Sequence, residues 1–173
     1  REEQRLRSKI KALSTISNDI SQAVRTQYEE NPYPRWVNPG LSPKPKTIRT
    51  ILQELKIDFN LTGQHFPSHP EILIAGCGTG QHSLGTASRF SNSSVLAVDL
   101  SLSSLSYAIR KTQELGISNI DYMHADILEL HKLDRQFDLI ESVGVLHHMA
   151  EPLAGWKVLV DLLRPRGLMR IGL

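Results

Sequence analysis

The chain has 173 residues, of which 40% are hydrophobic and 22% are charged, as in an ordinary globular domain. Twenty basic and 18 acidic side chains give a net charge of +2, too small a surplus to indicate nucleic-acid binding by charge alone. No apolar run approaches the ~18 residues of a membrane helix. The single cysteine, Cys77, excludes an internal disulfide and fits a reducing, cytoplasmic compartment.

The N-terminal part of the chain predicts one long amphipathic helix over residues 3–29. Its apolar residues recur every three or four positions and would form one stripe of that helix: Leu6, Ile10, Leu13, Ile16, Ile20, Val24 and Tyr28. Prolines at 32, 34 and 39 end the helix, because proline removes a backbone donor and forces the preceding residue out of helical geometry. This helix must bury its stripe against another part of the chain.

An aromatic segment follows the predicted helix. Tyr28, Tyr33 and Trp36 lie close together beside prolines, in a chain with only 6% aromatic residues. They are candidate substrate residues that wall the acceptor side of a site, and an equally good interpretation makes them a staple for the N-terminal helix. Further along, Thr47 predicts the N-cap of a second helix, which carries the apolar residues Ile48, Ile51, Leu52 and Leu55.

Residues 71–75 form an apolar run that predicts a strand, and alternate-position glycines follow it at once. The turn reads Gly76, Cys77, Gly78, Thr79 and Gly80. Glycine suits a sharp turn that uses positive φ and lets a ligand approach bare backbone. The spacing is Gly-x-Gly-x-Gly, and it differs from the Gly-x-Gly-x-x-Gly of dinucleotide-binding dehydrogenases.

The second predicted strand, 94–98, ends at Asp99, nineteen positions after Gly80. A carboxylate at the carboxyl end of such a strand can accept hydrogen bonds from a ribose diol, and the alternative is that Asp99 only helps to cap the next helix. Leu100 follows, and Ser101 predicts an N-cap for a helix over 102–115. Its residues Leu105, Ala108, Ile109 and Leu115 are expected to face the sheet.

Two more apolar strands are predicted, over 120–123 and 137–142. The first is followed by Asp126 and Ile127. The second ends at Ser142 and runs into Val143 to Met149, which includes His147 and His148. Because strands and helices alternate from residue 71, the pattern predicts a parallel α/β sheet with its ligand at the carboxyl ends of the strands.

From residue 71 to the end, the order of these motifs resembles the class I S-adenosylmethionine-dependent methyltransferases. The resemblance implies a Rossmann-like doubly wound sheet of strand order 3-2-1-4-5. It implies a cofactor, S-adenosyl-L-methionine, whose methionine part lies on the glycine turn and whose ribose hydroxyls bind Asp99. It places Asp126 near the adenine amino group with Ile127 beside the ring. The implied cofactor-binding residues are Gly76, Cys77, Gly78, Thr79, Gly80, Asp99, Leu100, Asp126, Ile127 and Ser142.

The resemblance also implies an activity. It implies an enzyme that transfers a methyl group to an acceptor, with small molecules, protein side chains and RNA bases all open. His147 and His148 are weak candidates for a general base, and the alternative is that they pack or bond to backbone. No metal site is expected, because adjacent histidines lack further ligands at convincing spacing. One departure is Ile74, where many members carry an acidic residue.

The expected organisation is an N-terminal helical extension or lid over 1–60 and a methyltransferase domain over 61–173. The segment Tyr-x-x-Asn-Pro-Tyr-Pro-Arg-Trp resembles one found ahead of some bacterial methyltransferase domains. We expect the sheet to lack its last two strands, as in a truncated domain. The alternatives to a methyltransferase are a regulatory module that binds S-adenosylmethionine without transfer, and a dinucleotide-dependent dehydrogenase, which the glycine spacing disfavours. The oligomeric state stays open.

Overall fold

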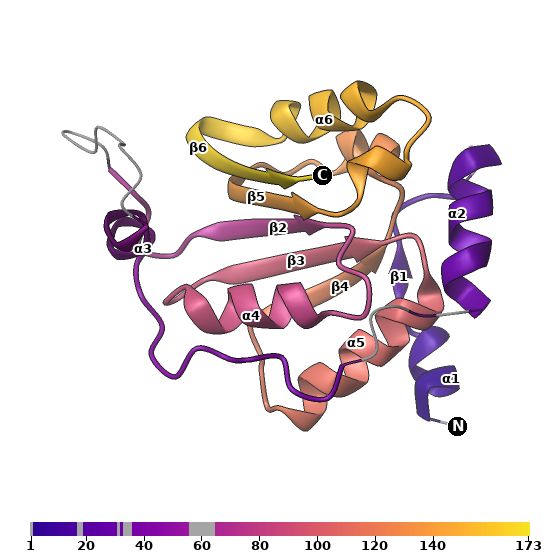
Figure 1. The fold of residues 1–173 in the computed structure, drawn as a ribbon, viewed down its shortest axis with the longest axis horizontal. Coiled ribbons are helices and arrows are strands. Elements are labelled where there is room, and N and C mark those ends of the chain that lie inside the picture. Colours follow the sequence, from indigo (N-terminus) through magenta and orange to yellow (C-terminus); the bar gives the residue numbers. More distant parts are fainter. Residues whose placement is uncertain (1, 17–18, 31, 33–35, 56–64) are drawn as a thin grey trace.

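The described residues, 2–16, 19–30, 32, 36–55 and 65–173 of a computed structural model, form a six-stranded sheet flanked by helices (Figure 1). In sheet order the strands are β1 (Lys11–Ala12), β4 (Ile120–His124), β3 (Ser94–Asp99), β2 (Glu71–Ala75), β5 (Phe137–Val143) and β6 (Leu163–Gly172). The helices are α1 (Glu2–Arg7), α2 (Asp19–Glu30), α3 (Ile48–Glu54), α4 (Gln81–Arg89), α5 (Leu102–Glu114) and α6 (Pro152–Asp161). Two short 3-10 helices are η1 (Ile127–Lys132) and η2 (Leu146–His148).

All strand pairs are parallel, and the order β4-β3-β2-β5-β6 is the predicted 3-2-1-4-5 arrangement. The predicted Rossmann-like fold is therefore confirmed. The chain runs from β2 outward to β4 and then returns to the other side of β2 with β5. Ligands of such sheets bind at the carboxyl edge where the strand order reverses, which here lies between β2 and β5.

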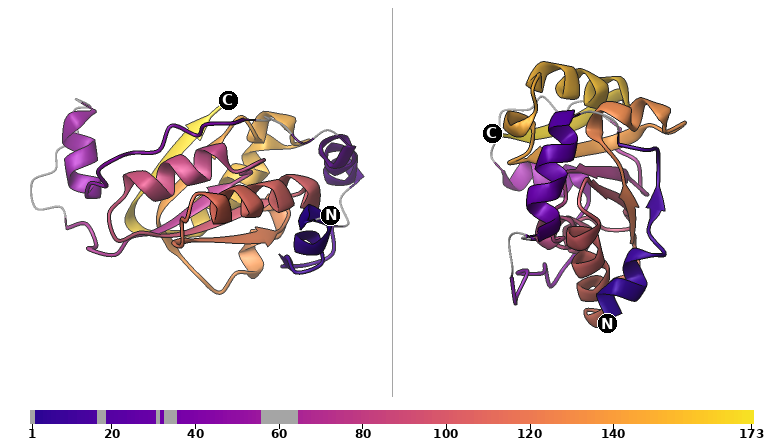
Figure 2. Two further views of the ribbon diagram at one scale, coloured as in Figure 1. Left: turned by 90° about the horizontal axis from the view of Figure 1, so that it is seen from below. Right: turned by 90° about the vertical axis from the view of Figure 1, so that its right-hand side faces the viewer.

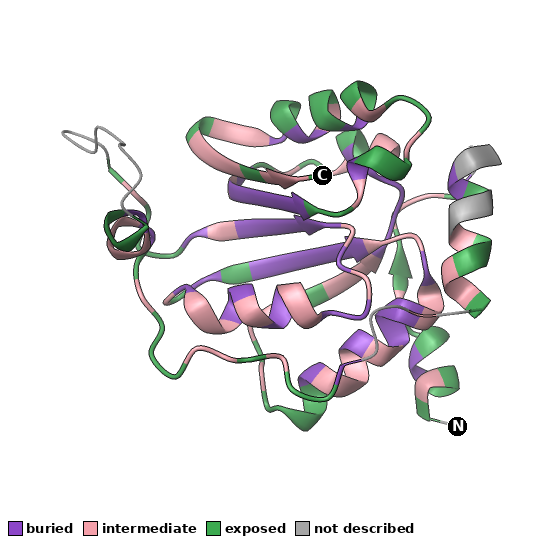
Figure 3. Ribbon diagram, in the orientation of Figure 1, coloured by how far each residue is buried: buried purple, intermediate pink, exposed green. Residues whose placement is uncertain are grey.

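The central strands are apolar because both faces of the sheet are covered (Figure 3). Leu73, Leu96 and Ile140 belong to one core that includes residues of η1 and α6. Ile72 and Ala97 belong to the other core, which includes residues of α3, α4 and α5. Successive side chains of a strand point to opposite faces, so this division follows from the strand geometry.

The predicted single helix over 3–29 is wrong. The chain leaves helical geometry after Arg7, forms β1 and resumes as α2 at Asp19. Strand β1 pairs with β4 in the register Lys11↔Met123, and the Leu13 N–H donates to the His124 carbonyl at 3.0 Å. These sheet hydrogen bonds cover the β4 edge, which a continuous helix would leave open. The side chains of Ile20 and Val24, two members of the predicted stripe, lie outside the described residues.

Helices α1 and α2 both pack against α5, at the same end of the molecule (Figure 2). The Glu29 carboxylate of α2 accepts hydrogen bonds from the Leu102 N–H at 2.6 Å and the Ser103 hydroxyl at 2.7 Å, at the start of α5. Arg7 of α1 forms an ion pair with the same carboxylate at 2.9 Å. Helix α2 is thereby held over the carboxyl edge of the sheet.

Two predicted helix starts are confirmed. Thr47 caps α3 by accepting from the Thr50 N–H, and Ser101 caps α5 by accepting from the Ser104 N–H. Leu105 and Ala108 are buried as expected, but Leu115 is 40% exposed because it lies at the C-cap, where the helix ends. Among the described helices, none is long and apolar enough to cross a membrane.

Candidate functional site

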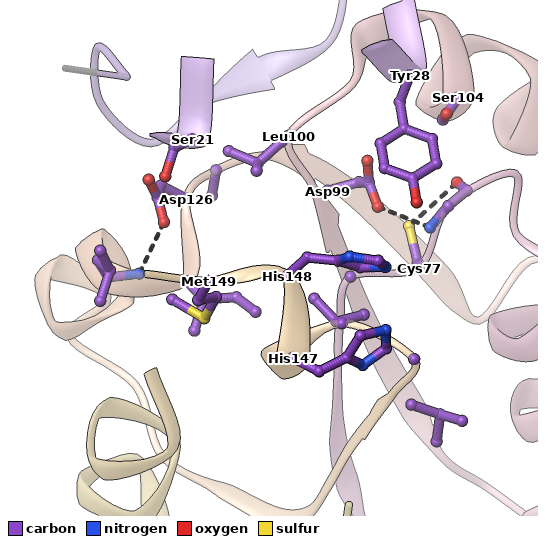
Figure 4. Close-up of a pocket in the computed structure, with 18 of the residues that line it drawn as sticks. Ser21, Tyr28, Cys77, Asp99, Leu100, Ser104, Asp126, His147, His148 and Met149 are labelled. Carbon is purple, nitrogen blue, oxygen red and sulfur yellow. Dashed lines mark hydrogen bonds between the residues drawn. The ribbon is translucent and has the colours of Figure 1, made fainter. Parts of the chain in front are cut away.

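A cavity of about 670 Å³ lies at the carboxyl edge of the sheet, where the strand order reverses (Figure 4). Its volume is in the range of pockets that hold small molecules and cofactors. Its walls come from α2, the glycine turn, the ends of β3, β4 and β5, and η2 with the start of α6. Seven of the predicted cofactor residues border it: Gly76, Cys77, Gly78, Asp99, Leu100, Asp126 and Ile127.

The glycine turn follows β2 in a conformation that few other residues can adopt. Gly76 has φ +80° and Gly80 has φ +89°. A Cβ at Gly76 would overlap the Val145 side chain, and one at Gly80 would lie 2.7 Å from the Ala108 Cβ. Glycine is required at both positions because of φ and because neighbouring elements approach the backbone closely.

Asp99 ends β3 with its carboxylate bound by backbone N–H groups. Oδ2 accepts from the Gly78 N–H at 2.7 Å, and Oδ1 accepts from the Ser101 N–H at 2.9 Å. Burial raises the pKa of Asp99, although the hydrogen bonds from Ser101 and Gly78 act in the opposite direction. Each oxygen has a further lone pair, so the carboxylate can still accept hydrogen bonds from hydroxyls in the cavity.

Asp126 lies after β4 at the other end of this wall and is 3% exposed. Its Oδ1 accepts from the Leu128 N–H at 3.0 Å, which makes Asp126 the N-cap of η1. Figure 4 shows the Ser21 hydroxyl of α2 directed toward this carboxylate. Ile127 follows and borders the cavity with an apolar side chain.

Three predicted cofactor residues do not border the cavity. Ser142 is fully buried and donates to the Ala75 carbonyl at 3.0 Å, joining β5 to β2. Thr79 is also fully buried, and its carbonyl accepts from the Trp36 indole N–H at 3.1 Å. Gly80 is the N-cap of α4 and lies against α5. The described contacts of these residues support the glycine turn on the side away from the cavity.

Trp36 lies behind the glycine turn as well. Its side chain is 6% exposed, and its ring lies edge-on to that of Tyr107 with centroids 5.8 Å apart. The Tyr107 hydroxyl donates to the Trp36 carbonyl at 2.7 Å. These are the contacts of a structural staple, and Trp36 is absent from the cavity lining. Tyr33 lies outside the described residues.

Tyr28 and the two histidines border the cavity from different elements. Figure 4 shows Tyr28 reaching from α2 toward Cys77 and Asp99, and His147 and His148 directed into the cavity from η2. The rings of His147 and His148 lie 4.0 Å apart. A general-base role for either stays a prediction.

Cys77 borders the cavity with a thiol that stays protonated. Burial raises the pKa of this thiol well above its usual range, and the negative charge of Asp99 adds to the effect. A thiolate is the nucleophilic form of cysteine, so the surroundings of Cys77 disfavour nucleophilic chemistry.

His82 and Glu141 form a pair that no sequence motif indicates. His82, in the first turn of α4, borders the cavity, and its Nε2 lies 3.0 Å from Glu141 Oε2 on β5. The two residues are 59 positions apart. The sequence does contain one signal for this pair. Glu141 is a charged residue inside the apolar run of β5, and a buried carboxylate needs a polar partner.

The fold and the position of the cavity define the class: a Rossmann-like domain with a cavity at the reversal of strand order. Residues 72–167, more than half of the chain, match the methyltransferase domain family. The chain therefore belongs to this family, and it is a class I methyltransferase domain, a type of enzyme that uses S-adenosylmethionine.

Three similar proteins illustrate the range of the family. An uncharacterized protein of Synechococcus sp. is 27% identical over 95% of this chain and 40% of its own length. A ubiquinone biosynthesis O-methyltransferase of Dinoroseobacter shibae is 33% identical over 57% of this chain and 38% of its own. The structure of PKMT2 from Rickettsia typhi in complex with AdoHcy is 28% identical, with a TM-score of 0.54 over 59% of this chain and 20% of that protein. The chain thus spans less than half of each relative.

Proposed function

We propose that the cavity binds S-adenosylmethionine and that the chain transfers its methyl group to a small-molecule acceptor. The observation that carries this proposal is the position of Asp99. The half-buried carboxylate of Asp99 at the end of β3 has its two oxygens fixed by the turn and by the start of α5, and it faces a cavity of suitable size. Two fixed acceptors on one carboxylate suit the neighbouring hydroxyls of a ribose.

The other walls of the cavity fit the rest of the cofactor. Asp126 and Ile127 offer an acceptor and an apolar surface for an adenine base. The backbone of Gly76 and Gly78 can approach the methionine part closely, because no Cβ intervenes. Ser104, which also borders the cavity, has the one buried side-chain oxygen without a partner in the described chain.

The bound cofactor supplies an electrophilic methyl group on a positively charged sulfur. The chain's own residues then need to hold the acceptor in line and to exclude water, which can supply much of the acceleration of such a displacement. The residues proposed for this role are Tyr28, His148 and Met149, and it is supported by their bordering the cavity from segments outside the glycine turn.

The charge of the cavity favours a small acceptor over RNA. None of the described residues that border it is lysine or arginine, whereas Asp99, Asp126 and Glu151 are acidic. An RNA acceptor would need basic side chains to neutralise its phosphates. We further propose a reducing, cytoplasmic setting, which the single cysteine supports.

Calorimetry and a transfer assay test this function. We expect S-adenosylhomocysteine to bind and NAD not to bind at millimolar concentration. Methyl transfer from labelled S-adenosylmethionine should appear with a panel of small hydroxylated and amino metabolites and not with total RNA. Binding of S-adenosylhomocysteine without transfer to any class of acceptor would favour a regulatory module, and binding of NAD alone would overturn the proposal.

A further inference from the structure

The pair formed by His82 and Glu141 lies between the cavity and the interior of the domain. Glu141 is 3% exposed, while the His82 side chain is 26% exposed and borders the cavity. Glu141 Oε2 also accepts from the Thr86 hydroxyl at 2.6 Å, and Oε1 lies 3.5 Å from Arg170 Nη1 of β6. Both carboxylate oxygens of Glu141 therefore have partners, and of these described partners His82 alone borders the cavity.

The protonation of this pair follows from its partners. Burial alone would raise the pKa of Glu141, but the hydrogen bonds from His82 and Thr86 and the charge of Arg170 lower it, so the carboxylate is ionised at neutral pH. An ionised carboxylate only accepts hydrogen bonds. In the neutral form of His82, Nε2 therefore carries the proton that is donated to Glu141, and Nδ1 keeps a free lone pair. Within the described chain, no group bonds to Nδ1.

The position of the pair along the sheet edge indicates which part of a ligand it meets. Asp126 follows β4, Asp99 ends β3, the glycine turn follows β2, and Glu141 lies on β5, beside Ile74 of β2. Two strand spacings separate β3 from β5, which amounts to roughly 10 Å. A ligand with its ribose at Asp99 that extends past the glycine turn reaches the pair with its far end.

We infer that His82 binds the α-ammonium group at the amino-acid end of the cofactor, with Nδ1 accepting an ammonium N–H, and that Glu141 is the positioning residue that fixes this orientation. The inference rests on the proposed function, because it takes the ribose to lie at Asp99. It adds a recognition role for two residues that lie outside the glycine turn. Buried ion clusters contribute little net stability compared with apolar residues of similar size, which is a reason to look for a binding role.

The test compares two ligands that differ at one group. Calorimetry measures the dissociation constants of S-adenosylhomocysteine and of its desamino analogue, in which hydrogen replaces the α-amino group. For the unaltered chain we expect the analogue to bind about ten- to a hundredfold more weakly, as for loss of a hydrogen bond to a charged group. In His82→Phe this ratio should fall below about threefold. His69→Phe, an exposed histidine before β2, is the matched control and should keep the full ratio.

The ratio separates binding from a structural role, because a general loosening of the cavity weakens both ligands equally. Glu141→Gln retains the shape of the side chain and should lower the ratio without abolishing it, which also tests the idea should His82→Phe not fold. A full ratio in either folded variant would overturn the inference while leaving the proposed function intact. Failure of the unaltered chain to bind S-adenosylhomocysteine would overturn both.

Discussion

The two ends of the sheet hold their acidic side chains in opposite ways. At the amino end, Arg164 lies 2.7 Å from Asp138 and 3.3 Å from Glu71, so each carboxylate has a cationic partner. At the carboxyl end, Asp99 and Asp126 bond to backbone N–H groups, and no cation in the described chain pairs with them. Removing a carboxylate from water without a cationic partner costs free energy, so the way Asp99 and Asp126 are held is not explained by stability alone.

This difference separates a structural cluster from a binding site within one sheet. Arg164, Asp138 and Glu71 at the amino end join β2, β5 and β6 to one another. The acids at the carboxyl end keep lone pairs directed at a cavity instead. Substitutions at the carboxyl end should therefore affect the ligand first, and those at the amino end should affect the free energy of unfolding first.

The largest effect is expected from a substitution in the glycine turn at the carboxyl end of the sheet. Gly76→Val would force a branched side chain into the space of Val145 and impose φ +80° on a β-branched residue. We expect the free energy of unfolding to fall by about 2–4 kcal/mol and binding of S-adenosylhomocysteine to be lost. Urea unfolding and calorimetry measure these, with Gly116→Val as the control for positive φ in open space. Retained binding would show that the close approach at Gly76 is not needed.

A smaller effect is expected behind the turn. Trp36→Phe keeps a buried ring but removes the indole N–H that bonds to the Thr79 carbonyl. The free energy of unfolding should fall by about 1 kcal/mol, with the dissociation constant for S-adenosylhomocysteine changed less than about threefold. A large loss of affinity with an unchanged free energy of unfolding would instead indicate that Trp36 takes part in ligand binding.

The smallest effects are those of pH, and they have opposite signs for the carboxylates of Asp99 and Glu141. Burial raises the pKa of Asp99, so the folded protein holds this proton more tightly than the unfolded chain. Its ionisation lowers stability as the pH rises from 3.8 through the folded pKa. The pKa of Glu141 is lowered: burial acts to raise it, but His82, Thr86 and Arg170 outweigh that effect. The stability contributed by ionised Glu141 is fully present above pH 4.5, and it is lost as the pH falls through the pKa of the folded state.

Urea unfolding at several pH values between about 3 and 7 checks this contrast. Relative to Asp99→Asn, the unaltered ligand-free chain should gain stability as the pH falls. Relative to Glu141→Gln, it should lose stability. Parallel curves for the two comparisons would contradict the assigned protonation states.

The parts of the fold that could be predicted are those with strong local signals. The strand at 71–75, the Ser101 cap and the alternation of strands and helices depend on residues close in sequence, and the structure confirms them. The single N-terminal helix was wrong because the apolar spacing of residues 6–28 suits a helix locally, whereas β1 depends on its pairing with β4, more than a hundred residues away. Such distant pairing leaves no periodic signal in the chain.

The candidate site also contains residues that the sequence predicts and residues that it does not. Gly76, Asp99 and Asp126 follow predicted strands, and parallel strands bring their carboxyl ends to one edge, so their meeting at one cavity could be foreseen. The contact of His82 with Glu141 could not, because it depends on how α4 packs against β5. The position of Trp36 behind the turn likewise depends on its contacts with α5.

The most direct test of the account is a calorimetric titration of S-adenosylhomocysteine into Asp99→Ala and Asp138→Ala, with urea unfolding of both. Asp99→Ala should weaken binding about ten- to a hundredfold, as expected for loss of a charge-assisted acceptor. Asp138→Ala should change binding less than about threefold but lower the free energy of unfolding by about 1–3 kcal/mol, since it removes one of the two carboxylate partners of Arg164 and leaves the Glu71 N–H without its acceptor. An unchanged dissociation constant for Asp99→Ala, or equal weakening by the two variants, would contradict the division between a binding end and a structural end.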